Sequence, residues 1–258
     1  PPSQFFVLHR RQLGRLLADT SGIDWLQRFS VIWVGGAALP AVMADQARQA
    51  GIRLAPCYGA TETAAMVAAL PPERFLHGET SCGAPLIDVE LRLAADGALE
   101  VKTGRLAMAF WQPEKPHQLQ DLSDASGWWR SGDRAVLEAD LRILGRLDGA
   151  VLSGGETVFP EQLEARLLAA DLPLEAVLLL GIPDAQWGER LVGLVRSSTP
   201  DIVERLQDVT QPWPAAERPK RWLLCPELAP SEAGKWQRSR WQAWLQSQES
   251  VHPLERDG

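Results

Sequence analysis

The sequence predicts an α/β architecture followed by an α+β architecture in one chain, and three observations carry this prediction. Residues 1–82 contain a strand–helix–strand pattern with glycines at the strand ends, which is typical of a parallel sheet. Residues 83–148 contain alternating apolar and polar runs separated by short turns, which is typical of antiparallel strands. Residues 149–258 contain amphipathic helical segments and short apolar strands, which indicate a smaller α+β domain.

The parallel part places a binding site at the ends of its strands. Apolar runs at 31–34 and 52–55 predict two short buried strands. Residues 40–49 lie between them and begin with a proline, which suits the first turn of a helix. Because ligands bind such sheets beyond the carboxyl ends of the strands, we expect a binding site at 35–37 and 58–63.

The antiparallel part is expected to form a small barrel-like subdomain. The runs 89–93 and 99–102 alternate in polarity and flank an Ala-Asp-Gly turn. Apolar residues on both sides of the acidic segment 138–140 predict a second hairpin. Clusters of Gly, Ser and Asp predict three further turns, at 131–133, 145–149 and 153–156.

The C-terminal domain begins after Asp148. Its predicted helices are 160–170 and 238–246, and its predicted strands are 174–180, 191–195 and 222–225.

Composition excludes several classes of protein. The formal net charge of −7 argues against a nucleic-acid-binding protein, which needs a basic face. Neither an apolar run of membrane-spanning length nor a signal peptide is seen, so we expect no membrane span. The three cysteines have no metal-ligand spacing and suit a reducing, cytoplasmic setting. The chain opens Pro-Pro-Ser, and we expect it to be processed or part of a longer protein. The oligomeric state stays open.

Three motifs occur in a defined order: Tyr-Gly-Ala-Thr-Glu-Thr at 58–63, Ser-Gly-Asp-Arg-Ala at 131–135 and Gly-Arg-Leu-Asp-Gly at 145–149. Together they resemble the acyl-adenylate-forming superfamily, which includes acyl-CoA synthetases, luciferases and adenylation domains of peptide synthetases. In these enzymes a carboxylate attacks the α-phosphorus of ATP, so fixed donors and cations must stabilise the phosphoryl oxygens. The resemblance implies an AMP-forming ligase that uses ATP, Mg²⁺, coenzyme A and a small-molecule acid.

The resemblance also implies roles for individual residues. Thr61 would donate its hydroxyl to an α-phosphate oxygen, and Glu62 would help to hold Mg²⁺. Asp133 would accept from the ribose hydroxyls, and Arg146 would donate to ribose or phosphate oxygens. The rest of the nucleotide pocket, with the tyrosine near the adenine, would be Gly35, Gly36, Ala37, Tyr58 and Gly59.

Each of these assignments has a structural alternative. The Thr-Glu pair at 61–62 also suits the N-terminal cap and first turn of a helix. The glycines at 35–36 also suit a tight strand-to-helix turn. Asp133 also suits a local Ser-Gly-Asp turn, and Arg146 also suits a surface ion pair with Asp148.

In this superfamily a small C-terminal domain rotates between two half-reactions. The resemblance makes Asp148 the hinge, and it places Gly154 and Gly155 along the channel for coenzyme A. Lys235 follows a glycine and precedes an arginine by three residues, as in the last motif of the family. It would enter the adenylation site and contact the carboxylate and the α-phosphate, although a solvated lysine is the alternative.

Within the superfamily the chain is most similar to the o-succinylbenzoate–CoA ligases of menaquinone and phylloquinone synthesis. The segments that carry this similarity are 34–40, 51–63, 145–167, 221–228 and 234–240. The acid has two carboxylates and only one is activated, so Arg10 or Arg11 is a candidate partner for the other; a solvated helix start is the alternative.

Two other functions stay open. One is a CoA ligase for another aromatic or fatty acid, and the other is a truncated module that binds adenylate without turnover. The Ser/Thr/Gly-rich phosphate loop of the family is absent from the sequence, and we expect it in a preceding region that completes the large domain.

Overall fold

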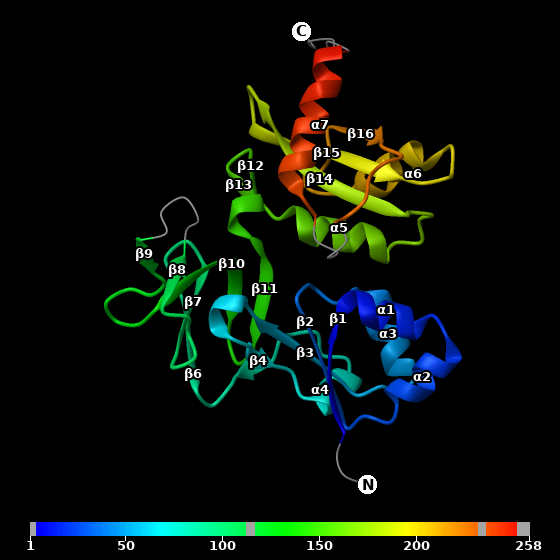
Figure 1. Cartoon of the computed structure of the whole chain (residues 1–258). Helices are drawn as coiled ribbons and strands as arrows, with labels where there is room; N and C mark the ends of the chain where they lie inside the picture. The colour runs from blue at the N-terminus through cyan, green and yellow to red at the C-terminus, as the bar shows by residue number, and fades with distance from the viewer. Residues whose placement is uncertain (1–3, 112–116, 232–235, 252–258) are drawn as a thin grey trace. The chain divides into compact units, whose positions relative to one another are not determined.

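The computed structural model describes residues 4–111, 117–231 and 236–251 (Figure 1). It has a mixed α/β architecture, and the chain divides into two compact units, Pro1–Asp148 and Gly149–Gly258. The division lies directly after Asp148, where the sequence analysis begins the C-terminal domain. Each unit has two buried apolar clusters of its own.

A five-stranded sheet forms the first part of unit 1. Its strands are β1 (Phe5–His9), β2 (Val31–Gly35), β3 (Leu54–Gly59), β4 (Met66–Ala69) and β5 (Ala84–Pro85), in the order β1-β2-β3-β4-β5. The first three strands are parallel; the sequence analysis predicts β2 and β3, and β1 is a further parallel strand that it does not predict. The last two are antiparallel additions that the sequence analysis does not predict. Only six residues separate β3 from β4, which is too short for a parallel crossover.

Helices cover this sheet. They are α1 (Arg10–Leu17), α2 (Thr20–Leu26), α3 (Ala41–Gln49) and α4 (Pro72–Leu76), with a 3₁₀ turn η1 (Thr61–Thr63). The core beneath them includes the fully buried Leu13, Ile32 and Leu54. The short helix α2 is not predicted from the sequence. It lies close to the end of α1 because Gly22 has no Cβ: one placed there would be 2.2 Å from the carbonyl oxygen of Leu16.

An antiparallel sheet forms the second part of unit 1, as predicted. Its strands are β6 (Val89–Leu93), β7 (Ala98–Thr103), β10 (Trp129–Leu137) and β11 (Leu141–Arg146), in the order β11-β10-β7-β6. A two-stranded ribbon, β8 (Ala109–Trp111) and β9 (Leu119–Asp121), accompanies it, and the 3₁₀ turn η2 (Leu147–Gly149) ends the unit. Residues 112–116, between β8 and β9, lie outside the described residues.

One predicted turn is wrong. Residues 131–133 lie inside the strand β10 rather than in a turn. The pairing of β10 with β7 shifts register between Arg130 and Arg134, so the strand is irregular there. Gly132 serves a close approach instead of a turn, because a Cβ at this position would be 2.6 Å from Nη2 of Arg146.

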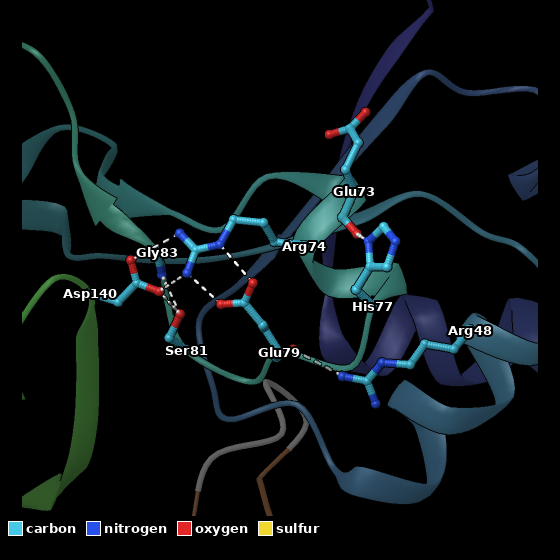
Figure 2. Close-up of polar contacts among 8 residues, drawn as sticks. All are labelled: Arg48, Glu73, Arg74, His77, Glu79, Ser81, Gly83 and Asp140. Carbon is cyan, nitrogen blue, oxygen red and sulfur yellow. Dashed lines mark hydrogen bonds and ion pairs between the residues drawn. The ribbon is translucent and has the colours of Figure 1, made fainter.

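A cluster of charged side chains joins the two sheets of unit 1 (Figure 2). Arg74, on α4, donates to both carboxylate oxygens of Asp140 at 3.1 and 2.6 Å, and its Nε donates to Glu79 at 2.8 Å. Ser81 donates to Asp140 at 2.6 Å and accepts from the amide of Gly83 at 3.1 Å. The cluster therefore fixes the turn between β10 and β11 against the segment that follows α4.

Unit 2 is an α+β domain, as predicted. Its strands are β12 (Val151–Ser153), β13 (Glu156–Val158), β14 (Ala176–Asp184), β15 (Gly188–Arg196) and β16 (Arg221–Leu224). They follow the order β13-β12-β15-β14, with β16 parallel to β15. The helices are α5 (Pro160–Ala169), α6 (Ile202–Thr210), which is not predicted, and α7 (Arg238–Val251).

The hairpin between β12 and β13 has a two-residue turn, Gly154–Gly155. Both glycines have positive φ, +60° and +86°, which is the backbone of a type I′ turn. The indole of Trp187 lies against the first of them, 2.6 Å from where a Cβ would stand. The three cysteines are free thiols, and no helix in the described part of the chain is both long and apolar enough to cross a membrane.

Candidate functional site

The strand ends of the five-stranded sheet bring the first candidate residues together. His9 and Gly35 are register partners at the carboxyl ends of β1 and β2. Gly36 follows with φ of +81°, and a Cβ there would be 2.8 Å from the imidazole of His9. A Cβ at Gly35 would be 3.1 Å from the sulfur of Cys57, on β3. The positive φ of Gly36 therefore favours glycine at this turn, whereas Gly35 only lies close to the Cys57 side chain, and a role beside the adenine stays a prediction.

The turn after β3 presents Thr61 and Glu62. Thr63 is fully buried, and its hydroxyl accepts from the amide of Ala60 at 3.0 Å and lies 2.7 Å from the carbonyl oxygen of Ala65. Thr63 therefore holds the loop shape. Thr61 is exposed on the 3₁₀ turn, while Glu62 is half-buried, and the amide of Ala107 donates to the Glu62 carbonyl at 2.8 Å.

Asp133 and Arg146 are register partners across β10 and β11. Their nearest charged atoms, Oδ1 and Nη1, lie 3.8 Å apart, whereas Arg146 makes shorter contacts with Asp148. Its Nε and Nη2 donate to the two oxygens of Asp148 at 3.0 and 2.8 Å. These carboxylates raise the pKa of Arg146, so the guanidinium keeps its charge. The ion pair with Asp148, the structural alternative for Arg146, is therefore present, and it leaves Nη1 directed to Asp133.

The hydroxyl of Tyr58 lies 2.5 Å from Oδ2 of Asp133. The two residues are 75 positions apart and come from different sheets. Burial raises the pKa of Tyr58, and the negative charge of Asp133 raises it further, so the phenol stays protonated. The tyrosine is therefore the hydrogen-bond donor to the carboxylate.

A cavity of about 500 Å³ lies over these residues, within the size range of small-molecule sites. It brings together three of the predicted residues, Glu62, Asp133 and Arg146. The other predicted residues of this unit are not among its lining side chains. The sequence analysis does not predict the remaining lining residues, which are Ala60, Glu100, Phe110, Gln120, Asp121, Leu122, Asp124, Trp128, Trp129, Arg130 and Gly132. The adjacent tryptophans at 128–129 are the one sequence feature that could have indicated this wall.

The residues of the cavity fit a magnesium ion held mainly by a nucleotide. No group of three or more potential ligands is present among the described residues. Mg²⁺ bound to a nucleotide needs only one or two protein carboxylates, because phosphates and waters complete its octahedron. Glu62 can supply such a carboxylate from the cavity wall. When bound, the ion would neutralise charge on the phosphates.

The other predicted residues are placed as follows. Nη1 of Arg10 is 3.4 Å from the carbonyl oxygen of Ala38, in the loop after β2. The side chain of Arg11 and the whole of Lys235 lie outside the described residues. The hinge and channel roles of Asp148 and of the glycines at 154–155 stay predictions.

Comparison with known proteins defines the class first. Residues 5–107 match the family model described as "AMP-binding enzyme", which confirms the resemblance to acyl-adenylate-forming enzymes. The chain is 30% identical over 241 residues to 2-succinylbenzoate–CoA ligase of Escherichia coli K12, covering 92% of this chain and 50% of the relative. It is 31% identical over 204 residues to the ligase of Geobacillus kaustophilus, covering 73% of this chain and 41% of the relative.

Solved structures of o-succinylbenzoate CoA synthetases are also similar to this chain. Escherichia coli MenE with a bound m-phenylether-linked analogue of OSB-AMS is 29% identical, with a TM-score of 0.70 and coverage of 95% and 51% of the two chains. Bacillus subtilis o-succinylbenzoate CoA synthetase with its acyl-adenylate intermediate shares the fold at 22% identity, with a TM-score of 0.80 and coverage of 93% and 51%. The chain spans about half the length of the curated relatives it matches.

Proposed function

We propose that this chain is the nucleotide-binding and small-domain part of an AMP-forming acid–CoA ligase whose acid is o-succinylbenzoate. The product would be o-succinylbenzoyl-CoA, an intermediate of menaquinone or phylloquinone synthesis. The single observation that supports the nucleotide site best is the cavity that Glu62, Asp133 and Arg146 line together. The choice of acid rests on the similarity to 2-succinylbenzoate–CoA ligases.

In the first half-reaction the acid carboxylate attacks the α-phosphorus of ATP and pyrophosphate leaves. Asp133 accepts hydrogen bonds from the ribose, and Arg146 donates to ribose or phosphate oxygens. Thr61 donates to an α-phosphate oxygen, and Glu62 would hold the magnesium ion that accompanies the nucleotide, which would neutralise charge on the phosphates. Lys235 supplies a mobile positive charge beside the carboxylate and the α-phosphate.

In the second half-reaction the thiol of coenzyme A attacks the acyl carbon, and AMP leaves. The glycines at 154–155 line the path of the pantetheine arm after the small domain turns about Asp148. We place the reaction in the cytoplasm, because all three cysteines are free thiols, as a reducing compartment favours.

A different aromatic acid is the alternative substrate. An anthranilate CoA ligase with bound anthranoyl-AMP shares the fold at 21% identity, with a TM-score of 0.75, so the architecture alone accommodates another acid. Binding of adenylate without turnover is the alternative activity.

The test is AMP release by the full-length gene product with ATP, coenzyme A and one acid at a time. We expect turnover with o-succinylbenzoate and little with anthranilate, benzoate or palmitate. Turnover with one of the latter in preference would disprove the assigned acid. AMP binding without turnover on any acid would identify a binding module. The same assay with Asp133→Asn should lose most of its activity.

A further inference from the structure

The contact between Tyr58 and Asp133 gives the tyrosine a second task. The resemblance assigns its ring a place near the adenine, while the structure shows its hydroxyl bound to Oδ2 of the carboxylate at 2.5 Å. A tyrosine that only stacked on a base would not need a hydroxyl, since phenylalanine supplies the same ring. The hydroxyl therefore acts on Asp133.

The geometry around Asp133 shows why the carboxylate needs a partner. Its backbone is fixed because the amide donates to the buried hydroxyl of Ser131 at 3.1 Å. The carboxylate itself lies 3.8 Å from the nearest Arg146 nitrogen, which exceeds a hydrogen bond. The guanidinium makes its short contacts with Asp148 instead. Among the hydrogen bonds of the described residues, the one from Tyr58 thus sets the rotation of the Asp133 side chain.

The Asp133 carboxylate keeps hydrogen-bond acceptor positions that a ligand can use. A carboxylate has about four acceptor positions on its two oxygens, and Tyr58 occupies one of them. The positions on Oδ1 and the second lone pair of Oδ2 are available to a diol in the cavity that Asp133 lines. A fixed carboxylate loses less side-chain entropy on binding than one free to rotate.

We propose that Tyr58 is a positioning residue for ribose recognition, whose hydroxyl holds Asp133 in the orientation that accepts the ribose hydroxyls. This inference rests on the proposed nucleotide-binding function and adds to it the source of selectivity for the sugar. It predicts that the hydroxyl of Tyr58 matters only for ligands that carry ribose hydroxyls.

The test compares AMP with 2′,3′-dideoxyadenosine monophosphate by calorimetry on the full-length protein. Wild type should bind AMP more tightly. Tyr58→Phe keeps the ring and should weaken AMP about 5-fold while leaving the dideoxy ligand unchanged. Tyr58→Leu removes the ring and should weaken both ligands. In Asp133→Asn, adding Tyr58→Phe should cost less than it does in wild type, because the two residues act through one contact.

Each result decides the proposal. Equal loss for both ligands in Tyr58→Phe, or no loss, overturns the positioning role while AMP binding by wild type upholds the nucleotide site. If wild type binds AMP and the dideoxy ligand with equal affinity, Asp133 does not recognise the ribose hydroxyls and the proposal is wrong. Wild type that binds neither ligand overturns the proposed function itself. Thermal unfolding of every variant confirms that the binding data refer to folded protein.

Discussion

Glu164 and Arg238 form a buried ion pair inside unit 2. Nη2 of the arginine lies 3.0 and 3.1 Å from the two carboxylate oxygens, and Nη1 donates to the carbonyl of Leu179 at 2.7 Å. The amide of Leu179 donates to the same carboxylate at 2.8 Å. Glu164 is only 5% exposed and Arg238 is partly buried, so the pair joins α5, β14 and α7 where water screens it weakly.

Removal of the arginine should destabilise the protein strongly. Above pH 7, where wild-type Glu164 is ionised, Arg238→Met leaves the buried carboxyl without its cation, and the free energy of unfolding should fall by about 2 to 4 kcal/mol. Urea unfolding with hydrogen exchange in α5, β14 and α7 measures this loss. Glu161→Gln is the matched control, since Glu161 also contacts Arg238 but its side chain is 33% exposed. The double variant Arg238→Met/Glu164→Leu should recover much of the loss, and no recovery would show that packing rather than charge is responsible.

The same pair predicts a pH dependence. Burial raises the pKa of Glu164 to about 7, because desolvation outweighs the attraction of Arg238. In the unfolded chain the carboxyl titrates near 4.5. Between these values the folded protein binds a proton that the unfolded chain releases, so stability falls as pH rises. The stabilisation by the protonated Glu164 carboxyl is complete below pH 4.5 and lost above about pH 7.

Glu164→Gln should remove this dependence. From pH 4.5 to 7.5, wild type should lose unfolding free energy relative to the variant. Each unit by which the folded pKa of Glu164 exceeds its unfolded pKa is worth about 1.4 kcal/mol. Urea titrations at half-unit pH intervals give the curve. A constant difference across this range would show that Glu164 titrates normally in the fold.

In the Gly154–Gly155 turn of unit 2, alanine at position 154 should cost more stability than alanine at position 155. Gly154→Ala puts a Cβ 2.6 Å from the Trp187 ring at a φ of +60°, and it should cost about 1 to 3 kcal/mol. Gly155→Ala meets open space at a φ of +86° and should cost only about 1 kcal/mol. Chemical unfolding of both variants checks the order. Equal costs would mean that Trp187 moves aside.

Much of the fold could be predicted from the sequence, because apolar periodicity and turn residues are local. The parallel strands at 31–34 and 52–55 and the hairpin around 138–140 follow from them. Helices α2, α4 and α6 were missed. The first two have only seven and five residues, too few to show a period, whereas α6 has apolar residues at helical spacing, Ile202, Leu206 and Val209, that could have predicted it. The turn predicted at 131–133 fails because glycine also serves close approach, and Gly132 makes room for Arg146.

The site was predicted only in part. Motif resemblance supplied Glu62, Asp133 and Arg146, and these line one cavity. The hydrogen bond from Tyr58 to Asp133 joins residues 75 positions apart, so no local pattern could reveal it. The wall formed by Phe110 and the residues near Trp128 has no family motif, and a tryptophan pair is more often packing than ligand contact.

Loss of the Asp133 carboxylate should weaken the nucleotide. Asp133→Ala removes charge-assisted hydrogen bonds to the ribose and should cost about 1.5 to 3 kcal/mol of AMP binding. It also leaves the buried hydroxyl of Tyr58 without its acceptor, so Asp133→Asn, which keeps an acceptor oxygen, is the matched variant. Calorimetry measures both. Unchanged AMP affinity in a folded Asp133→Ala protein would remove this residue from the site.

The last prediction separates the two half-reactions through residues at and beyond the boundary of the two units. Lys235 lies 87 positions beyond Asp148 in the sequence, within the range of the second unit. Under the proposed function it serves only adenylation. In the full-length enzyme, Lys235→Ala should abolish adenylate formation and still transfer a supplied acyl-adenylate to coenzyme A. Lys220→Ala is the matched control, since this lysine of the same unit contacts Asp184 and has no assigned chemistry.

Asp148→Pro should do the reverse, because proline fixes φ at the proposed hinge. It should form the adenylate and stall before the thioester. The substitution also removes the carboxylate that pairs with Arg146, so Asp148→Ala is needed beside it: the alanine variant loses the same ion pair but keeps a rotatable φ. Single-turnover assays of each half-reaction decide. If the alanine variant stalls as the proline variant does, then the ion pair with Arg146, and not rotation at residue 148, governs thioester formation. For Lys235→Ala, an equal loss of both half-reactions would contradict domain alternation.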